Sequence, residues 1–253
     1  MTEVKDFFIK ENSIDYVPDE AYNDIDSIIE DIDAFSRLTY KSVYVIDYYK
    51  QNFLFVSDNP LFLCGMSPEE VKEMGDGFYI NQVISDDLDL LLDVNRAGFK
   101  FSQEIPVNDL RDYTISYDFH IINKISKKRW LINHQITPLR LTDDGKVWLA
   151  LCVASIPSGS ESGNIVVLKN DTKERWIYDR NSKKWNKIEP PELKDIEADV
   201  LKLSAMGYTM QEIADEVNRS FDTVKVYRKS LLEKLGVENI IEAINFAKTH
   251  KII

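Results

Sequence analysis

The chain has 253 residues, a length that favours two domains over one. Hydrophobic residues make up 44% and charged residues 29%, a globular balance that argues against a disordered or fibrous chain. Against 31 Lys and Arg residues stand 43 Asp and Glu residues, so the net charge is −12. Taken whole, this acidity counts against a polyanion such as DNA as a partner, unless the sum hides a local basic face.

The cysteines and the apolar runs of the sequence indicate in which cellular compartment the protein is expected. Cys64 and Cys152 are far apart and form no CxxC pair, which fits reduced thiols and gives no thiolate metal site. The N-terminal MTEVKDFFIKEN is acidic, and its apolar run is too short for a signal peptide. The strongest apolar run, Val147–Val153, has the length of a strand and not of a membrane span. We therefore expect a soluble, cytoplasmic protein with no membrane partner.

The first 39 residues alternate acidic and apolar side chains at helical spacing, which predicts an N-terminal helical segment with a helix near Pro18–Arg37. Its apolar face is marked by Ile25, Ile28, Ile29, Ile32 and Phe35. The acids on the other face account for much of the negative charge, and we interpret them as a solvated surface. An acidic recognition surface is the alternative.

From Lys41 onward the apolar period changes to two. Five strands are expected, at residues 43–49, 53–56, 113–122, 130–139 and 147–156. Between the second and third strand the sequence predicts helices, one beginning at Ser67-Pro-Glu-Glu70 with N-cap, N1 and N3 signals, the other over residues 86–97. Two strands, short helices and three strands form an α+β pattern with one antiparallel sheet.

This order resembles a PAS domain, a sensor fold in which a five-stranded sheet and small helices can enclose a pocket. The resemblance covers about 115 residues and rests on order and pattern, not on signature residues. It implies a sensor or dimerisation domain over residues 40–157, with a small-molecule ligand or a protein partner. The sequence requires no cofactor. A binding domain of the acyl-homoserine-lactone type is the alternative for this region.

The three histidines are candidates for a metal or catalytic site, and the strand periodicity argues against one. Period-two alternation puts His120 on the polar face of one strand and His134 on the inner face of the next. Because they point to opposite sides of the sheet, we expect no metal site. His134 is a candidate contact to a pocket ligand, with a hydrogen-bonded core histidine as the alternative, and His250 lies in the tail. The adjacent acids Asp86 and Asp87 are explained as capping residues at a helix start.

No enzyme signature is present, because the sequence lacks GxGxxG, a P-loop, HExxH and GxSxG. We expect no catalytic activity. The stretch Pro157-Ser-Gly-Ser-Glu-Ser-Gly163 predicts a flexible segment, and short strands follow at 165–169, 175–179 and 184–188 before Pro190-Pro191. We interpret residues 158–191 as a linker with a small β-meander.

Residues 192–253 are typical of an all-α domain of four helices separated by short turns. Gly207 stands where a C′ glycine belongs, Thr209 and Glu212 make a capping box, Ser220 is the N-cap of the third helix, and Gly236 ends that helix. The second and third helices, of about eight and fifteen residues, have a helix-turn-helix layout.

The third helix carries a basic outer face. At about 100° per residue, one side collects Val224, Tyr227, Leu231 and Leu235. The opposite side collects Lys225, Val226 and Lys229, with Arg228 on the flank. Residues 218–234 have a net charge of +3, so a positive patch lies inside an acidic protein.

The run Leu193–Ala247 resembles the LuxR/FixJ-type DNA-binding domain. Matching positions include Leu193, Glu197, Val200, Leu201, Gly207, Thr209, Glu212, Ile213, Ala214, Ser220, Thr223, Val224, Lys225, Arg228, Lys234, Leu235, Gly236, Val237, Glu242 and Ala243. The resemblance implies a four-helix domain that binds double-stranded DNA as a dimer, with the third helix in the major groove and the last helix often at the dimer contact. Lys194, Tyr227 and Ile240 depart from the residues that are common in the family.

Six residues are candidates for DNA contact. Lys225 and Lys229 can reach phosphates or guanine acceptors, and Val226 can contact a thymine methyl group. Thr223 near the helix start and Lys234 near its end are candidates for phosphate contact. Arg228 on the flank is a further candidate for DNA contact. A solvated helix surface is the alternative for each.

The sequence thus predicts a sequence-specific, DNA-binding transcription regulator that acts as a homodimer and is modulated at a PAS-like domain. The alternative is a ligand- or protein-binding interaction module whose helical C-terminal domain docks a protein partner. Residues 1–190 carry a net charge of −10 and residues 191–253 a net charge of −2. We therefore expect DNA contact to be confined to the third helix and its edges.

Overall fold

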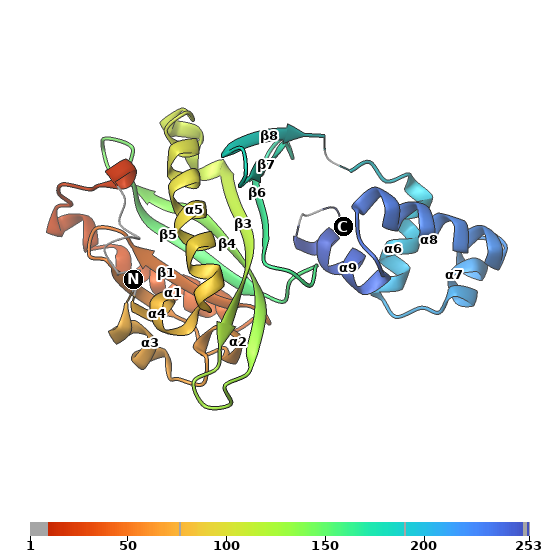
Figure 1. Ribbon diagram of the computed structural model, residues 1–253, viewed down its shortest axis with the longest axis horizontal. Helices are drawn as coiled ribbons and strands as arrows, with labels where there is room; N and C mark the ends of the chain where they lie inside the picture. The colour runs from red at the N-terminus through yellow and green to blue at the C-terminus, as the bar shows by residue number, and fades with distance from the viewer. Residues whose placement is uncertain (1–9, 76, 190, 250–251, 253) are drawn as a thin grey trace. The chain divides into compact units, whose positions relative to one another are not determined.

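The computed structural model describes residues 10–75, 77–189, 191–249 and 252. The first nine residues of the acidic N-terminal stretch, Pro190 at the predicted boundary and His250 lie outside the described residues. The chain divides into two compact units, Met1–Ser155 with Glu161–Ile188, and Ile156–Ser160 with Glu189–Ile253 (Figure 1).

Within the described residues, one antiparallel sheet organises the first unit. Its strands are β1 Ser42–Asp47, β2 Asn52–Val56, β3 Tyr113–Ile122, β4 Arg129–Leu141, β5 Val147–Ser155, β6 Gly163–Lys169, β7 Arg175–Asp179 and β8 Lys184–Ile188. They lie in the order β2-β1-β5-β4-β3-β6-β7-β8. The first five of these strands are the predicted ones, displaced by no more than two residues at their ends.

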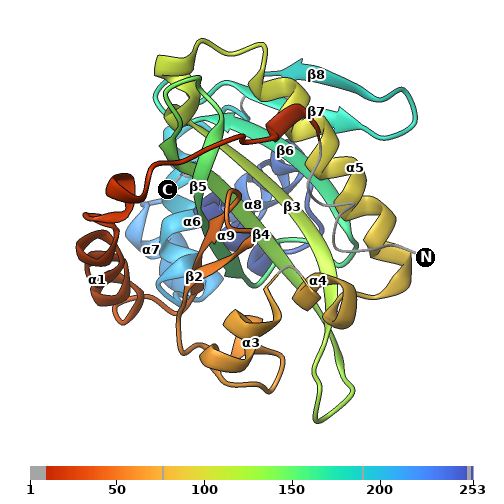
Figure 2. The same cartoon turned by 90° about the vertical axis from the view of Figure 1, so that its left-hand side faces the viewer.

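Helices cover both faces of this sheet (Figures 1 and 2). They are α1 Ile25–Ser36, α2 Pro60–Leu63, α3 Pro68–Met74, α4 Gly77–Gln82 and α5 Ser85–Ser102, with 3-10 turns η2 Lys10–Asn12, η3 Asp19–Tyr22 and η4 Val107–Asp112. Alternation along β1 separates two apolar clusters, because Tyr44 and Ile46 pack with the side chains of α2–α5, whereas Val45 packs with those of α1. The order β2-β1-β5-β4-β3, with helices between β2 and β3, confirms the predicted PAS-like α+β fold.

Local signals explain two of these helices. The Ser67 hydroxyl accepts a hydrogen bond from the Glu70 amide, and the Glu70 carboxylate accepts one from the Ser67 amide, which is the predicted capping box of α3. Leu90, Leu91 and Val94 are buried on one side of α5, at the spacing of an amphipathic helix. Helix α5 is five residues longer at its C-terminal end than the predicted 86–97.

Two expectations about the first unit are wrong in detail. Phe35 was expected on the buried face of the first helix, but its side chain is 60% exposed. The apolar cluster under α1 extends from Ile25 to Ile32 and does not include Phe35. Asp87 does not cap α5, whose N-cap is Ile84. It is buried, and its Oδ2 accepts a hydrogen bond of 2.7 Å from the His120 amide and lies 2.9 Å from His120 Nδ1.

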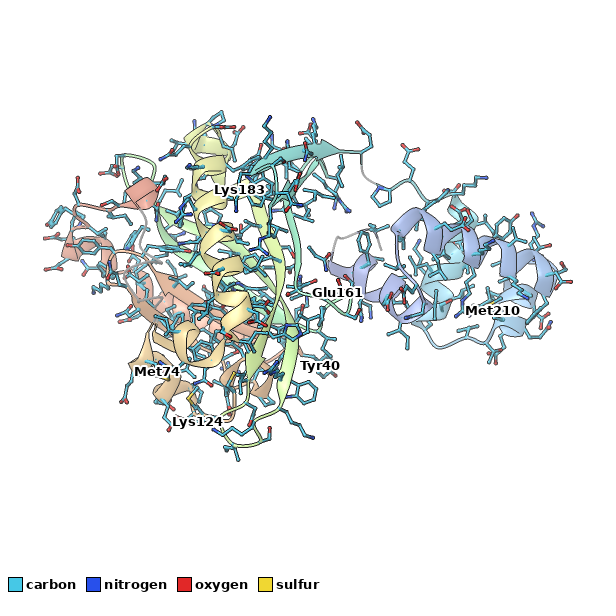
Figure 3. All side chains as sticks on the ribbon, viewed as in Figure 1. Tyr40, Met74, Lys124, Glu161, Lys183 and Met210 are labelled. Atoms are coloured by element: carbon cyan, nitrogen blue, oxygen red, sulfur yellow. The ribbon has the colours of Figure 1, made fainter. Side chains whose placement is uncertain are left out.

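The meander belongs to the sheet and not to a linker. Strand β6 pairs with β3, with Ile115 opposite Val167, and β7 and β8 continue from β6. Lys183, labelled in Figure 3, lies on the β7–β8 turn. Its Nζ lies 2.6 Å from Asp93 Oδ2 of α5. The predicted linker 158–191 therefore supplies three strands of the first unit. The reason is that a strand edge pairs over any sequence distance, which a local pattern does not reveal.

The second unit is the predicted four-helix domain. Its helices are α6 Asp195–Ala205, α7 Met210–Glu216, α8 Phe221–Leu235 and α9 Ile240–Thr249. The predicted capping box of Thr209 and Glu212 is present, and Gly236 ends α8 in the left-handed conformation at φ +66°. Its core consists of buried residues from all four helices, namely Val200, Leu201, Ile213, Ala214, Val224, Leu231, Leu235, Ala243 and Ala247. In the described part of the chain, no helix has both the length and the apolarity to cross a membrane.

Candidate DNA-binding surface and sensor cavity

The rotation of α8 is set by its cap and its apolar side. The Ser220 hydroxyl accepts a hydrogen bond of 3.2 Å from the Thr223 amide and so starts the helix. Val224, Leu231 and Leu235 are buried against the other helices, and Tyr227 packs against this core. Because one side is held inward, Lys225, Val226 and Lys229 face outward, as predicted.

Lys225, Val226 and Lys229 form what we call the outer face of α8. Val226 is 64% exposed, so its methyl groups are accessible beside the two lysines. Lys229 Nζ lies 3.7 Å from Glu233 Oε1 of the next turn, and both side chains are well exposed. A pair of this kind contributes about 0–1 kcal/mol, so it does not hold the ammonium group away from a stronger anion.

Thr223 and Arg228 lie at the edges of this face. The Thr223 hydroxyl is 2.8 Å from the Ser220 hydroxyl and is thus part of the helix cap. Arg228 is half-buried on the flank of α8. Both remain beside the outer face, at the start and along the side of the helix.

Lys234 has a different surrounding from the other candidates. Its Nζ lies 2.6 Å from Glu197 Oε2 and 3.0 Å from the Glu192 carbonyl oxygen. Glu197 is buried and also accepts hydrogen bonds from the Ser230 hydroxyl and the Lys194 amide. Burial raises the pKa of Glu197, but these hydrogen bonds and the charge of Lys234 outweigh it, so the pKa lies below its ordinary value. The structure therefore gives Lys234 a partner inside the domain, where the sequence suggested a phosphate.

The three departures from the family pattern are accommodated within the domain. Lys194 stands at the N-cap of α6, where Glu197 accepts a hydrogen bond from its amide. Tyr227 and Ile240 are partly buried and pack against the core. None of the three lies on the outer face of α8.

Comparison with known families decides the identity of this unit. Residues 193–247 match the family of bacterial regulatory proteins described as the luxR family. The C-terminal domain is a LuxR-type helix-turn-helix domain. The LuxR-type domain is 46% identical over 50 residues to the transcriptional regulatory protein RcsB of Escherichia coli, a match that covers 20% of this chain and 23% of RcsB. Over 61 residues it is 33% identical to the Fimbriae Z protein of Salmonella typhimurium, covering 24% of this chain and 29% of that protein. The chain thus spans about a quarter of the length of these relatives.

Similar solved structures extend over more of the chain at lower identity. A phage VqmA–DPO complex has a TM-score of 0.29 at 17% identity, with 90% of each chain covered. The Vibrio cholerae VqmA dimer gives 0.32 at 16% identity, with 87% of this chain and 86% of that chain covered. A PAS domain from Colwellia psychrerythraea gives 0.38 at 12% identity, with 51% and 96% covered. All three scores are low, so the PAS-like assignment rests on the strand order.

The PAS-like unit contains a cavity of about 100 Å³ between α5, η4 and the sheet. Phe99 and Phe101 of α5 line it, together with Tyr113 and Tyr117 of β3 and Ile136 of β4. No sequence signal pointed to these residues as a group, because they come from elements far apart in the chain. In the described residues, no cluster of three His, Cys, Asp or Glu side chains is placed to hold a metal ion.

His134 lies behind this cavity and does not line it. It is 1% exposed, its Nδ1 is 2.7 Å from the Tyr117 hydroxyl, and its Nε2 is hydrogen-bonded to the Tyr44 hydroxyl. Burial lowers the pKa of His134 to about 3, so the ring is neutral and pairs one donor and one acceptor nitrogen with the two tyrosines. The structure thus makes His134 a hydrogen-bonded core residue, and Tyr117 is the group that separates it from the cavity.

Proposed function

We propose that this protein is a transcription regulator that binds specific double-stranded DNA as a homodimer through α8. The outer face of α8 carries this proposal, because it presents two lysines and an exposed valine from the recognition position of a LuxR-type domain. We further propose that the PAS-like unit receives the signal, as a ligand in its cavity or a partner on its surface.

The chemistry of the outer face suits a major groove. Lys225 and Lys229 are one helical turn apart, so their ammonium groups can reach a phosphate and a guanine acceptor in succession. Val226 between them offers a methyl contact to thymine. Thr223 and the amides at the start of α8 are suited to bind a second phosphate. Lys234 is paired with Glu197 and is not assigned a DNA contact.

Charge distribution supports contact through one helix. Residues 1–190 hold 22 basic and 32 acidic residues, so they repel a phosphate backbone. DNA is attracted to the outer face of α8 alone, and non-specific binding is expected to be weak. Binding falls with rising salt, because each neutralised phosphate releases a counterion.

An electrophoretic shift assay tests this function, with the full chain and a duplex that the chain enriches from a random library. Lys225→Ala combined with Lys229→Ala removes two contacts worth about 1–3 kcal/mol each, so affinity should fall at least about 30-fold. Lys202→Ala with Lys248→Ala is the matched control, because both lysines are exposed in the same domain and lie on α6 and α9. This control should bind within about 3-fold of the wild type. Equal affinity of the α8 variant and the wild type would favour a domain that docks a protein instead.

A further inference from the structure

A groove distinct from the cavity described above lies between α5 and the meander strands β7 and β8 (Figures 1 and 2). Its volume is about 510 Å³, which is in the range of small-molecule sites. Positions 93, 96, 97 and 100 of α5 line it at helical spacing, whereas the cavity is lined by positions such as 94, 95, 98 and 99. Among the described lining residues, the two sites share Phe101 alone. The groove is therefore a second candidate site on the same unit.

The lining of the groove is basic, although the unit around it is acidic. It contains four cations and two carboxylates, namely Arg96, Lys100, Lys183, Lys184, Asp93 and Glu104. The net charge of these side chains is +2, whereas residues 1–190 as a whole carry −10. The groove is thus a local site of attraction for an anion.

The charge of Asp93 is balanced by two cations. Its Oδ2 lies 2.6 Å from Lys183 Nζ and 3.4 Å from Arg180 Nη2. Burial raises the pKa of Asp93, but the hydrogen bonds and charges of Lys183 and Arg180 outweigh burial, so the pKa lies below its ordinary value. Asp93 therefore ties the β7–β8 turn to α5 and offers little repulsion to a bound anion.

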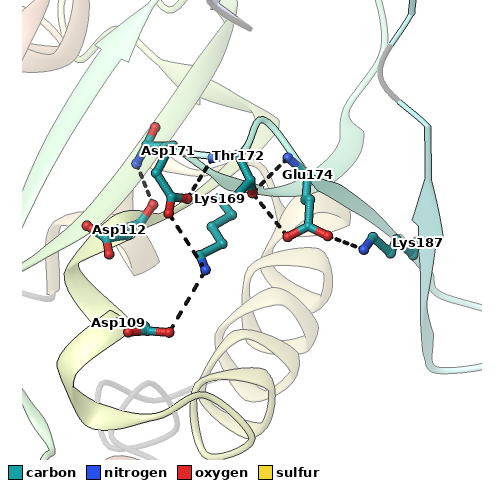
Figure 4. A network of polar contacts seen from close by, with 8 residues as sticks. Asp109, Asp112, Lys169, Asp171, Thr172, Glu174 and Lys187 are labelled. Atoms are coloured by element: carbon teal, nitrogen blue, oxygen red, sulfur yellow. Dashed lines mark hydrogen bonds and ion pairs between the residues drawn. The ribbon is translucent and has the colours of Figure 1, made fainter.

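Other lysines of the meander are paired in a similar way. Lys169 Nζ lies 3.9 Å from Asp109 Oδ2 and 3.8 Å from Asp171 Oδ2, and Lys187 is paired with Glu174 (Figure 4). These two lysines have their counter-charges within the protein, so they leave little unbalanced charge for a ligand.

Three cations of the groove have no such partner. Arg96, Lys100 and Lys184 are exposed, and none of them forms an ion pair within the part of the chain that the structure describes. Arg96 and Lys100 are one helical turn apart on α5, so they lie on the same side of the helix. A guanidinium group offers two parallel donors to a phosphate, and an ammonium group adds a point charge beside it. Three unpaired cations match an anion of two or more charges better than a single carboxylate.

Aromatic rings form the apolar part of the lining. Trp185 Nε1 donates a hydrogen bond of 3.3 Å to the Ala97 carbonyl oxygen, which fixes the indole ring against α5. The centroid of this ring lies 4.9 Å from that of Tyr178 and 5.2 Å from that of Phe101. A fixed group of rings favours a planar ring in the ligand, because aromatic faces and edges attract one another.

We propose that the groove binds a nucleotide, with the phosphates on Arg96, Lys100 and Lys184 and the base against Trp185 and Tyr178. A nucleotide combines several negative charges with a planar ring, and cations beside aromatic side chains are the surroundings that such a molecule requires. This inference goes beyond the regulator function proposed above. It depends neither on DNA binding by α8 nor on the occupant of the cavity.

The test is a calorimetric titration of the full chain with ADP at low salt and without Mg²⁺. We expect saturable binding with a Kd at or below about 100 μM, which is an ordinary affinity for a ligand of this size. Adenosine lacks the phosphates and ribose 5-phosphate lacks the base, so each should bind at least about 10-fold more weakly than ADP. The absence of saturable ADP binding would overturn the proposal, as would binding of either fragment with the affinity of ADP.

Substitution of two exposed side chains places ADP in the groove. Arg96→Gln combined with Lys100→Gln should weaken ADP binding at least about 10-fold. Because both side chains are exposed and unpaired, this variant should keep the circular dichroism spectrum and the unfolding temperature of the wild type. Lys72→Gln with Lys128→Gln is the matched control, since both lysines are exposed in the same unit outside the groove, and it should bind ADP within about 3-fold of the wild type.

The outer face of α8 is the other basic surface to which ADP could bind. Lys225→Ala combined with Lys229→Ala should therefore leave the Kd of ADP unchanged within about 3-fold. Loss of ADP binding in this variant, with wild-type ADP affinity in the variant of Arg96 and Lys100, would place ADP on α8 and refute the groove as a nucleotide site.

Discussion

A buried histidine makes the stability of the PAS-like unit depend on pH. His134 has a pKa of about 3 in the folded protein, because burial disfavours its charged form. Its ordinary pKa in an unfolded chain is about 6.5. Between these two values the unfolded state binds more protons than the folded state, so stability falls as pH falls from 6.5 toward 3. Above pH 6.5 the full stability is present.

His134→Gln should remove this dependence while leaving an amide to pair with Tyr44 and Tyr117. The free energy of unfolding of the wild type should lose up to about 1.4 kcal/mol per pH unit more than that of the variant between pH 6 and pH 4. Urea unfolding at several pH values measures this difference. Equal slopes in the wild type and His134→Gln would contradict the account.

Two lysines of the candidate set, Lys225 and Lys234, are predicted to differ in their effects on stability and on DNA binding. Lys234→Met leaves Glu197 buried without its cation, so the LuxR-type domain should lose about 2 kcal/mol of unfolding free energy. Lys225→Met should leave stability within about 0.5 kcal/mol and lower the slope of log affinity against log salt by about 1.

Thermal unfolding and DNA affinity at three salt concentrations measure both effects. A Lys234→Met protein of unchanged stability with a reduced salt slope would restore Lys234 as a phosphate contact.

At the scale of elements, local sequence signals were sufficient to predict most of the strands and helix starts. Alternation located β1 to β5, and caps such as Ser67 with Glu70 or Thr209 with Glu212 marked helix starts, because both depend on neighbours in the chain. The angular position of Val224 on α8 was sufficient to predict which lysines face outward. The family resemblance then indicated the DNA contact that we propose for that face.

Non-local contacts account for what the sequence missed. Strand β6 pairs with β3 across about 50 residues of chain, and Lys234 meets Glu197 across 37. Asp87 was interpreted as a cap, because nothing nearby reveals its bond to His120, 33 residues away. The cavity is the same kind of case, since its lining is drawn from α5, η4 and the sheet.

On the scale of the whole molecule, an acidic chain carries a confined basic surface. The net charge of −12 is concentrated in the first 190 residues, and each unit has its own buried core. Under the proposed function, this arrangement separates signal reception from DNA contact in the sequence. It also means that the proposed DNA binding rests on the outer face of α8 and not on the overall charge.

Selection of duplexes from a random-sequence DNA library by the full-length chain tests this central claim most directly. The account predicts enrichment of a sequence with two symmetric half-sites, as a dimer with one recognition helix per protomer requires. Enrichment should weaken as the salt concentration rises. A library that stays random after repeated rounds, with protein whose helices are intact by circular dichroism, would contradict the account.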